Sequence, residues 1–481
     1  MRRRHRSAAL LAVLAVAAAG CRTTVPHVRP ELPTAPAYPA ELAPDPAAGI
    51  PAPEIGWREL FADPRLEALL DAALERNRDL VAAVARVEEA RGLFRIVDAD
   101  RLPTVDAAAS ASRTRLPESE GGETFDRFAI GVRVPGFELD FWGRVRNLSD
   151  AARARYLATV EGARAFRLLL VRDVAAAYLA SLEAAQRIEL AEATVESRRE
   201  GLRIAGVRFE AGITSALDFR QAESLLTQAE AELAALRLAK AERDNLLAVL
   251  VGGPVPGELP PSRPLTEQIE AGALAPGLPS DLLLARPDVL AAEERLRAAR
   301  ADVGAARAAF FPRIALTGDL GFASAELSDL VGSDGLTWSF GPSITLPIFN
   351  RGRLHGDLTV AEAREVIAVA DYEITVQLAF QEVANALAGR RYLAEQVDAL
   401  LRGVEAQRAI AELARTRYRE GVVRYLEVLD AERNLFAAEQ ALLQLRRAEV
   451  ENLVALYVAL GGGLAADGEG EEAAEPEVAG D

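Results

Sequence analysis

The sequence is poor in the residues that most enzymes and metal proteins use. Its 481 residues include one cysteine, Cys21, and three histidines, His5, His27 and His355. A single cysteine excludes an intrachain disulfide. The histidines are far apart in the sequence, and no Ser/His/Asp set, metal-ligand spacing or phosphate-binding loop accompanies them. We therefore predict a protein that is not an enzyme and that holds no metal or cofactor.

The sequence also has few aromatic residues and a deficit of positive charge. Aromatic residues make up 6% of the chain, whereas apolar residues make up 50% and many of these are alanine. This composition is typical of long, closely packed helices. The formal charge of -17 repels phosphate backbones, so nucleic acid is excluded as a partner.

The apolar run at the N-terminus is too short to cross a bilayer. Residues 1–20 begin with basic residues and continue with alanine, leucine and valine, which indicates a signal peptide. The run ends at Gly20-Cys21, an ending that resembles a bacterial lipobox. This resemblance implies cleavage before Cys21, a covalent lipid on Cys21 and, because Arg22 follows, sorting to the outer membrane. An ordinary secretory peptide with an incidental cysteine is the alternative.

The two ends of the mature chain differ in composition from its body. Prolines recur throughout residues 21–56, which predicts an extended tether after the lipid rather than a helix. Residues 464–481 are rich in glycine and acidic residues and show no apolar periodicity, which predicts a disordered tail.

The body of the chain contains an internal repeat in which matching segments are 209 residues apart. RDVAAAYL at Arg172 matches QEVANALA at Gln381, and RFEAGITSALD at Arg208 matches RYREGVVRYLE at Arg417. LPTV and LVGG in the first half match FPRI and ALGG in the second at the same offset. Such agreement indicates a duplication. We place the first copy at 57–253, a proline-rich linker at 254–286 and the second copy at 287–463.

Each copy reads as a helix, a β-hairpin, a very long helix, a turn and a long helix. No proline interrupts the stretches from Gly143 to Phe209 and from Arg351 to Tyr418. A continuous helix of that length would extend roughly 100 Å. Valines in the second copy follow a seven-residue spacing that predicts a coiled-coil interface. They are Val376, Val383, Val397 and Val404.

The hairpin segments carry apolar residues at alternate positions. The clearest examples surround Trp338, Leu320 and Ile130, whereas the segment from Val105 to Ala111 is a weaker, alanine-rich version. Strands of about ten residues with one apolar face suit a transmembrane barrel, and a soluble sheet covered on one face is the alternative. Four strands cannot close a barrel, so several chains must share it. Three chains would give twelve strands and two would give eight.

Several long motifs occur in the order found in a known family. They are LPSDLLLARPDVLAAEERL from Leu278, AFFPRIALTGDLGF from Ala309, LPIFNRGRL from Leu346 and YLEVLDAERNLF from Tyr425, with DPRLEALLDAALERN and ELDFWGRVR in the first copy. The chain resembles the outer membrane factor family, the TolC/OprM-type efflux channels, and in particular its NodT-type lipoproteins. The resemblance extends over residues 57–463.

The resemblance implies a fold class and a function. The fold would be an α+β membrane protein: a homotrimer with a 12-stranded transmembrane β-barrel, four strands per chain, continued by a long α-helical periplasmic barrel. The linker at 254–286 would lie at an equatorial belt. The protein would be the outer membrane channel of a tripartite efflux system, lipid-anchored and in contact with outer membrane lipid. It would passively export small molecules or drugs delivered by an inner-membrane pump of the RND type through a periplasmic adaptor (membrane fusion protein).

Two acids near the end of the second copy are candidate functional residues. Glu427 and Asp430 are three positions apart on one helix face, and their spacing alone fits either a solvated charged face or an acid/base pair. The resemblance instead assigns them to a network that closes the periplasmic end of the helical barrel. It makes Asp218 and Tyr418 the expected partners between the copies, with Arg424 supplying a basic group. The candidate gate residues are Asp218, Tyr418, Arg424, Glu427 and Asp430.

The turns beside this network are the expected docking points for the adaptor. Gly212 and Gly421 should supply the positive φ angles that such tight turns require. Two other classes of protein stay open from the sequence. One is a periplasmic coiled-coil adaptor or scaffold lipoprotein, and the other is a lipoprotein hydrolase that uses Glu427 and Asp430.

Overall fold

The computed structural model describes residues 23–31, 33–39, 41–42, 49–269, 274–275, 286–332 and 334–462. The predicted signal peptide, the lipid site Cys21 and the predicted acidic tail lie outside the described residues. The chain divides into two compact units. Unit 1 comprises Met1–Glu31, Ala85–Glu161 and Leu290–Ile374, and unit 2 comprises Leu32–Val84, Gly162–Val289 and Thr375–Asp481. Each unit therefore combines matching segments of both sequence copies.

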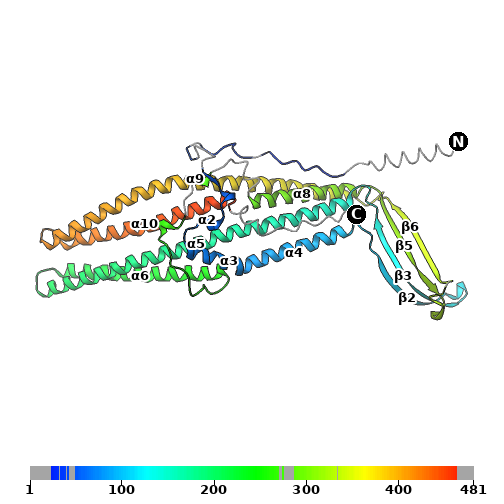
Figure 1. The fold of residues 1–481 in the computed structure, drawn as a ribbon, viewed down its shortest axis with the longest axis horizontal. Coiled ribbons are helices and arrows are strands. Elements are labelled where there is room, and N and C mark those ends of the chain that lie inside the picture. The colour runs from blue at the N-terminus through cyan, green and yellow to red at the C-terminus, as the bar shows by residue number, and fades with distance from the viewer. Residues whose placement is uncertain are drawn as a thin grey trace. The chain divides into compact units, whose positions relative to one another are not determined.

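Unit 1 contains a four-stranded antiparallel sheet (Figure 1). Its strands are β2 (Asp106–Arg115), β3 (Thr124–Glu138), β5 (Arg313–Ser324) and β6 (Leu336–Thr345). The order β2-β3-β5-β6 joins the hairpin of the first copy to that of the second through β3 and β5. Among the described residues, β2 and β6 each pair with one neighbour only, so both are edge strands.

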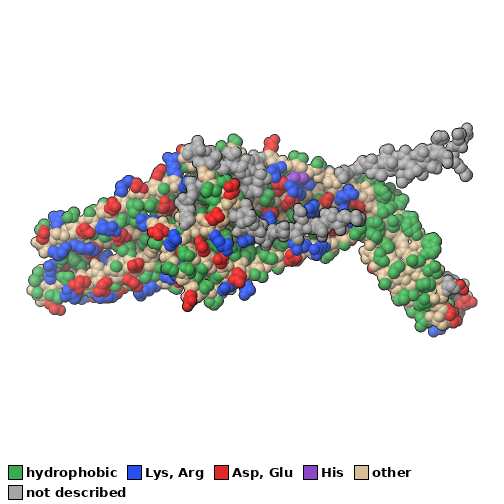
Figure 2. Space-filling model, viewed as in Figure 1, with side chains coloured by type: hydrophobic (Ala, Val, Ile, Leu, Met, Phe, Trp, Pro, Cys, Tyr) green, Lys and Arg blue, Asp and Glu red, His purple; other side chains and the backbone are tan. Residues whose placement is uncertain are grey.

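The two faces of this sheet differ as the alternating sequence predicts. Ile130 lies opposite Phe322, and Leu320 lies opposite Trp338, so large apolar side chains share one face. Figure 2 shows hydrophobic side chains spread over the strands. The other face carries small and polar residues, among them the cross-strand pair of Asp106 and Arg133. The four predicted strands are therefore confirmed.

The predicted long helices are also confirmed. The helices α5 (Arg144–Glu210) and α9 (Arg353–Arg419) each contain 67 residues and begin 209 positions apart. The first copy adds α2 (Trp57–Leu60), α3 (Pro64–Arg76), α4 (Arg78–Ala99) and α6 (Ala216–Val251), and the second adds α8 (Pro287–Ala308) and α10 (Tyr425–Ala459). The matching order of helices, hairpins and turns confirms the internal repeat. Within the described part of the chain, no helix combines the length and apolar character needed to cross a bilayer.

The remaining described elements are short. They are the 3-10 helices η1 (Ala52–Glu54), η2 (Glu118–Glu120), η3 (Leu265–Glu267) and η5 (Leu327–Asp329), and a parallel pair of β1 (Ile50–Pro51) with β4 (Leu274–Ala275).

The helices of unit 2 pack through rows of small and branched side chains. Ala191 and Val195 of α5 lie against Leu233 and Leu236 of α6, and Phe436 of α10 packs on the same cluster. In α9 the predicted heptad positions Val376, Val383 and Val404 are buried. Because α5 contacts both α6 and α10, the two copies share one apolar row rather than forming separate pairs.

A buried carboxylate fixes the linker between the copies. Asp63 is fully buried and caps α3 by accepting the N–H of Arg65 at 2.8 Å. Its other oxygen accepts the hydroxyl of Tyr178 at 2.6 Å, the N–H of Arg263 at 2.9 Å and the amide of Gln268 at 2.9 Å. Burial raises the pKa of Tyr178, which stays protonated and keeps donating. These bonds hold α3, α5 and the linker together.

The proline-rich N-terminal segment makes more contacts than a free tether would. In unit 1, His27 and Arg29 both reach the buried carboxylate of Glu293, at 3.0 Å and 2.8 Å. In unit 2, Tyr38 is buried and stacks on Phe380 with 5.1 Å between ring centroids. The described residues of this segment form no α-helix, and they contact the body of the chain at His27, Arg29 and Tyr38.

Candidate gate at the ends of the helical pairs

The turns that end the two helical pairs have the same backbone. We call residues 211–218 the first tip and residues 420–427 the second tip. Gly212 and Gly421 have φ angles of 69° and 75°, which confirms the predicted positive values. In each tip the next N–H closes the turn on the preceding helix, from Ile213 to Arg208 at 2.8 Å and from Val422 to Arg417 at 2.9 Å.

The first tip is stabilised by its own residues. The side chains of Ser215 and Asp218 form a capping box at the start of α6: the Ser215 hydroxyl accepts the N–H of Asp218 at 3.2 Å, and the Asp218 carboxylate accepts the N–H of Ser215 at 3.3 Å. The hydroxyl of Thr214 donates to the same carboxylate at 2.7 Å. These hydrogen bonds, with a smaller contribution from Arg424, hold the pKa of Asp218 below its usual value.

The second tip lacks this cap. Arg424 occupies the position that matches Ser215, and its side chain makes no capping hydrogen bond at the start of α10. Glu427, which matches Asp218, is exposed. Asp430 lies one turn further along α10 and forms an ion pair with Arg433 at 3.0 Å. The two acids therefore line one surface of α10, and within the described part of the chain they share no proton donor.

Two tyrosines of the second copy lie against α5 of the first. Arg208 donates a hydrogen bond to the hydroxyl of Tyr418, and its guanidinium carbon lies 4.8 Å from the centre of the Tyr418 ring. Tyr418 packs on Tyr425 with 5.1 Å between ring centroids. The Tyr425 hydroxyl covers Gly201 so closely that a Cβ atom there would lie 2.2 Å from it. Burial raises the pKa of Tyr425 to about 12.

We call this set of contacts, between Gly201 and Arg208 of α5 and Tyr418 and Tyr425 of the second copy, the seam. The sequence did not predict Gly201, Arg208 or Tyr425 as part of the site. Glycine within a long helix is unfavourable and often marks a close contact, so Gly201 could have indicated from the sequence that another side chain packs closely there. The expected partners Asp218 and Tyr418 each have another partner within the chain: Asp218 bonds to Thr214 and Ser215, and Tyr418 bonds to Arg208.

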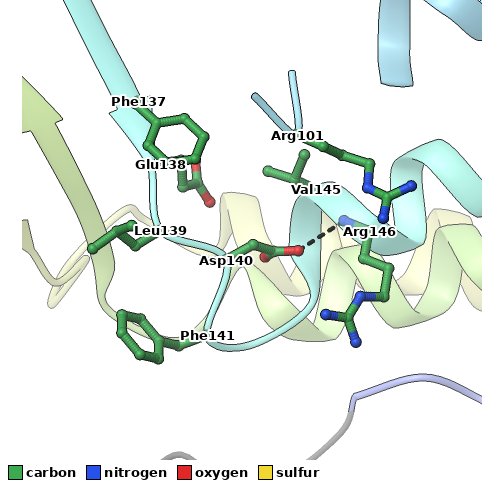
Figure 3. A pocket seen from close by; sticks show the side chains of 8 residues that line it. All are labelled: Arg101, Phe137, Glu138, Leu139, Asp140, Phe141, Val145 and Arg146. Carbon is green, nitrogen blue, oxygen red and sulfur yellow. Dashed lines mark hydrogen bonds between the residues drawn. The ribbon is translucent and has the colours of Figure 1, made fainter. Parts of the chain in front are cut away.

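A pocket in unit 1 is a structural junction and not a second candidate site. It has a volume of about 330 Å³ and lies where β3 leads into α5 (Figure 3). In Figure 3 the Asp140 carboxylate points to the start of α5, where it accepts the N–H of Arg146 at 2.8 Å. Glu138 forms ion pairs with Arg144 at 2.7 Å and with Arg313 at 2.6 Å. Glu138 and Asp140, the two acids of this pocket, therefore fix the end of β3 and the loop after it to the start of α5.

The described residues contain no group of three or more histidine, cysteine, aspartate or glutamate side chains placed to hold a metal. His355 is exposed and packs edge-on against Phe310 at 5.1 Å. The chemistry available at the two tips is therefore charge and hydrogen bonding along the helices.

Comparison with known proteins assigns the chain to a family. The family model described as "Outer membrane efflux protein" matches residues 69–253, within the first sequence copy, and residues 278–462, which begin in the predicted linker and cover nearly all of the second copy. The chain is 45% identical over 410 residues to the toluene efflux pump outer membrane protein TtgI of Pseudomonas putida, covering 84% of this chain and 87% of TtgI. It is 41% identical over 455 residues to the outer membrane protein OprJ of Pseudomonas aeruginosa, covering 94% and 95% of the two chains.

Solved structures agree with these relatives. The open state of the Neisseria gonorrhoeae MtrE outer membrane channel matches with a TM-score of 0.85 and 40% identity, over 92% of this chain and 99% of MtrE. The outer membrane channel OprN matches with a TM-score of 0.84 and 33% identity, over 92% of this chain and 100% of OprN. The relatives are efflux channel proteins rather than enzymes. The chain therefore belongs to the outer membrane efflux protein family, and it is an outer membrane efflux channel.

Proposed function

We propose that three copies of the chain form a passive conduit with a 12-stranded barrel in the outer membrane and a helical barrel in the periplasm. The observation that carries this proposal is the four-stranded sheet with two open edges, β2 and β6. Lipid cannot satisfy the unpaired N–H and C=O groups of an edge strand. Pairing β6 of one copy with β2 of the next removes every edge once the ring closes.

The apolar face of the sheet suits contact with lipid. Trp338 is 73% exposed and Ile344 is 71% exposed in the single chain, whereas a soluble sheet would bury such large apolar side chains. Two copies would supply only eight strands, and the family resemblance favours three. A covalent lipid on Cys21 would add an anchor to the same membrane. We infer no catalytic activity.

The gate of this conduit would be the second tip. In a trimer, Glu427 and Asp430 would place six carboxylates around one axis, and rings of acids favour cations. The closed state would then combine repulsion among these acids with attraction across the seam. A periplasmic adaptor that binds the turns at Gly212 and Gly421 could shift this balance by small helix movements.

We propose that an inner-membrane pump of the RND type selects the substrate. Relatives with similar identity carry names that point to different substrates: TtgI is a toluene efflux protein, and the Escherichia coli protein CusC, 40% identical over 409 residues, is a cation efflux protein. A conduit that accepts what its pump delivers accounts for this variety. Small molecules or drugs are therefore the proposed cargo.

The assembly is tested by native mass spectrometry of the full chain extracted from outer membranes in detergent. We expect the mass of three chains, with dissociation to single chains only on heating. A stable dimer would contradict the twelve-stranded barrel. A water-soluble monomer would contradict the conduit as a whole and would favour a periplasmic adaptor or scaffold.

The gate ring is tested by the double substitution Glu427→Ala and Asp430→Ala. Because three-fold symmetry removes six negative charges, we expect the cation preference of trimers in planar bilayers to fall several-fold, measured as a reversal potential in a salt gradient. Glu196→Ala with Glu200→Ala, which removes two exposed acids of α5, is the matched control and should leave the preference unchanged. Equal effects of the two double variants would remove the ring assignment.

A further inference from the structure

An arginine lies in the row of buried, mostly apolar side chains of α5. Arg198 follows Val195 in the buried row of α5, and Ala205 continues the row toward the first tip. Only 6% of Arg198 is exposed, in a single chain without its proposed partner copies. Charged side chains at such positions weaken a coiled coil unless they are paired.

Arg198 has no ion-pair partner among the described residues. Its Nη1 atom is fully buried and makes no hydrogen bond within the described part of the chain. The charged groups that act on it from α10 are Glu432 and Arg433. Glu432 is already bonded to Arg415 at 2.8 Å, and Arg433 carries the same charge as Arg198. Burial lowers the pKa of Arg198, yet a guanidinium stays protonated at neutral pH, so the charge persists.

The charge of Arg198 is buried next to the seam, so the free-energy cost of burying it depends on the same helix contact. Gly201, which Tyr425 covers, lies one turn further along α5. The part of α5 that is near the start of α10 therefore carries both the favourable tyrosine packing at Gly201 and the buried charge of Arg198. Moving α10 away would expose Arg198 to water and remove the cost of its burial.

We propose that Arg198 is a positioning residue of the gate, whose buried charge without an ion pair opposes the contact between α5 and α10 and so favours release of the second tip. The tyrosine contacts of the seam stabilise the contact between the second tip and α5. The charge of Arg198 destabilises the same contact, so that it can be broken reversibly. This inference rests on the proposed gate, because it assumes that the second tip is the part that moves.

The test compares Arg198→Met with Arg198→Lys in full-length trimers in planar bilayers. Methionine keeps the length and removes the charge, so the fraction of time spent open should fall roughly tenfold, and the midpoint of thermal dissociation should rise. Lysine keeps the charge, so its open fraction should stay within about twofold of the unsubstituted channel. Arg199→Met, at the exposed neighbouring position, is the control and should leave the open fraction unchanged.

Each alternative outcome is informative. If Arg198→Met leaves the open fraction unchanged or raises it, Arg198 supports the seam by packing and the proposal is wrong. If lysine and methionine lower the open fraction equally, shape rather than charge controls the seam, and the proposal is also wrong. Arg198→Gln, which introduces the residue found at the matching position 407, gives a second uncharged variant should the methionine variant fail to assemble. A clear effect of Arg198→Met with no effect of the Glu427 and Asp430 substitutions would keep Arg198 in the gate and remove the acid ring.

Discussion

The first and second tips connect equivalent helices with the same glycine turn, yet they are stabilised in different ways. The first tip satisfies its own helix end through Ser215 and Asp218. The second tip has no side-chain cap, and Tyr425 in the tip and Tyr418 just before it lie against α5 instead. A turn that depends on contacts with another helix can be released by breaking those contacts, whereas a self-capped turn cannot. This difference supports the proposal that the second tip is the one that moves.

A few substitutions between the copies account for this difference. Ser215 is matched by Arg424, so the second copy loses its capping hydroxyl. Phe209 is matched by Tyr418, which gains the hydroxyl that accepts from Arg208. Gly201 is matched by Ile410, so at this position only the first copy leaves room for a tyrosine ring on its long helix.

The substitution Gly201→Leu should have the largest effect on the difference between the two tips. Leucine favours the helix by about 1 kcal/mol relative to glycine, but its Cβ would meet the Tyr425 hydroxyl, and overpacking of this kind costs about 1–3 kcal/mol. We expect Tyr425 to leave α5 and the open fraction of trimers in planar bilayers to rise by about tenfold. Gly403→Leu in α9, where nothing lies within 4 Å of an added Cβ, is the control. Equal openings in both variants would mean that Tyr425 does not hold the tip.

Loss of the arginine in the seam should have a smaller effect. Arg208→Gln removes a charged hydrogen-bond donor and the cation over the Tyr418 ring, worth about 1 kcal/mol in a partly exposed setting. We expect the open fraction to rise by roughly fivefold. Tyr418→Phe keeps the ring and removes only the acceptor, so its effect should be weaker. Arg220→Gln, whose guanidinium lies over Phe219 near the first tip, is the matched control. A rise as large in Arg220→Gln would contradict the difference between the tips.

Much of this architecture follows from the sequence, because it depends on local patterns. The absence of proline predicts α5 and α9, alternation predicts the strands, and glycine predicts the two turns. The seam could not be predicted in the same way, because the contact of Tyr425 with Gly201 joins residues from different copies whose helices must first be known to be neighbours. Prolines likewise predict an extended N-terminal segment, but they do not predict that His27 reaches Glu293.

The cap of the first tip should respond to acid. Hydrogen bonds lower the folded pKa of Asp218, so its stabilising contribution is complete above the unfolded value of about 4 and is lost as pH falls through the folded pKa. Hydrogen exchange of the amides in the first turn of α6, corrected for intrinsic rates, should therefore accelerate at low pH. Asp218→Asn should remove this acid step and cost about 0.5–1 kcal/mol of local stability at neutral pH. An acid step that persists in Asp218→Asn would assign it to another carboxyl.

The substitution Arg424→Ser should make the second tip resemble the first. It places a serine three residues before Glu427, which is the spacing of a capping box, and such a cap contributes about 0.5–1 kcal/mol. The start of α10 should then exchange its amide hydrogens several-fold more slowly, which is the direct measurement. The effect on opening should be the smallest of the series, because a cap orders the turn without adding a contact to α5. A strong fall in the open fraction would mean that fraying of α10, and not release of the seam, limits opening. The two tips would then differ in how well ordered their helix starts are, and not in their contacts with α5.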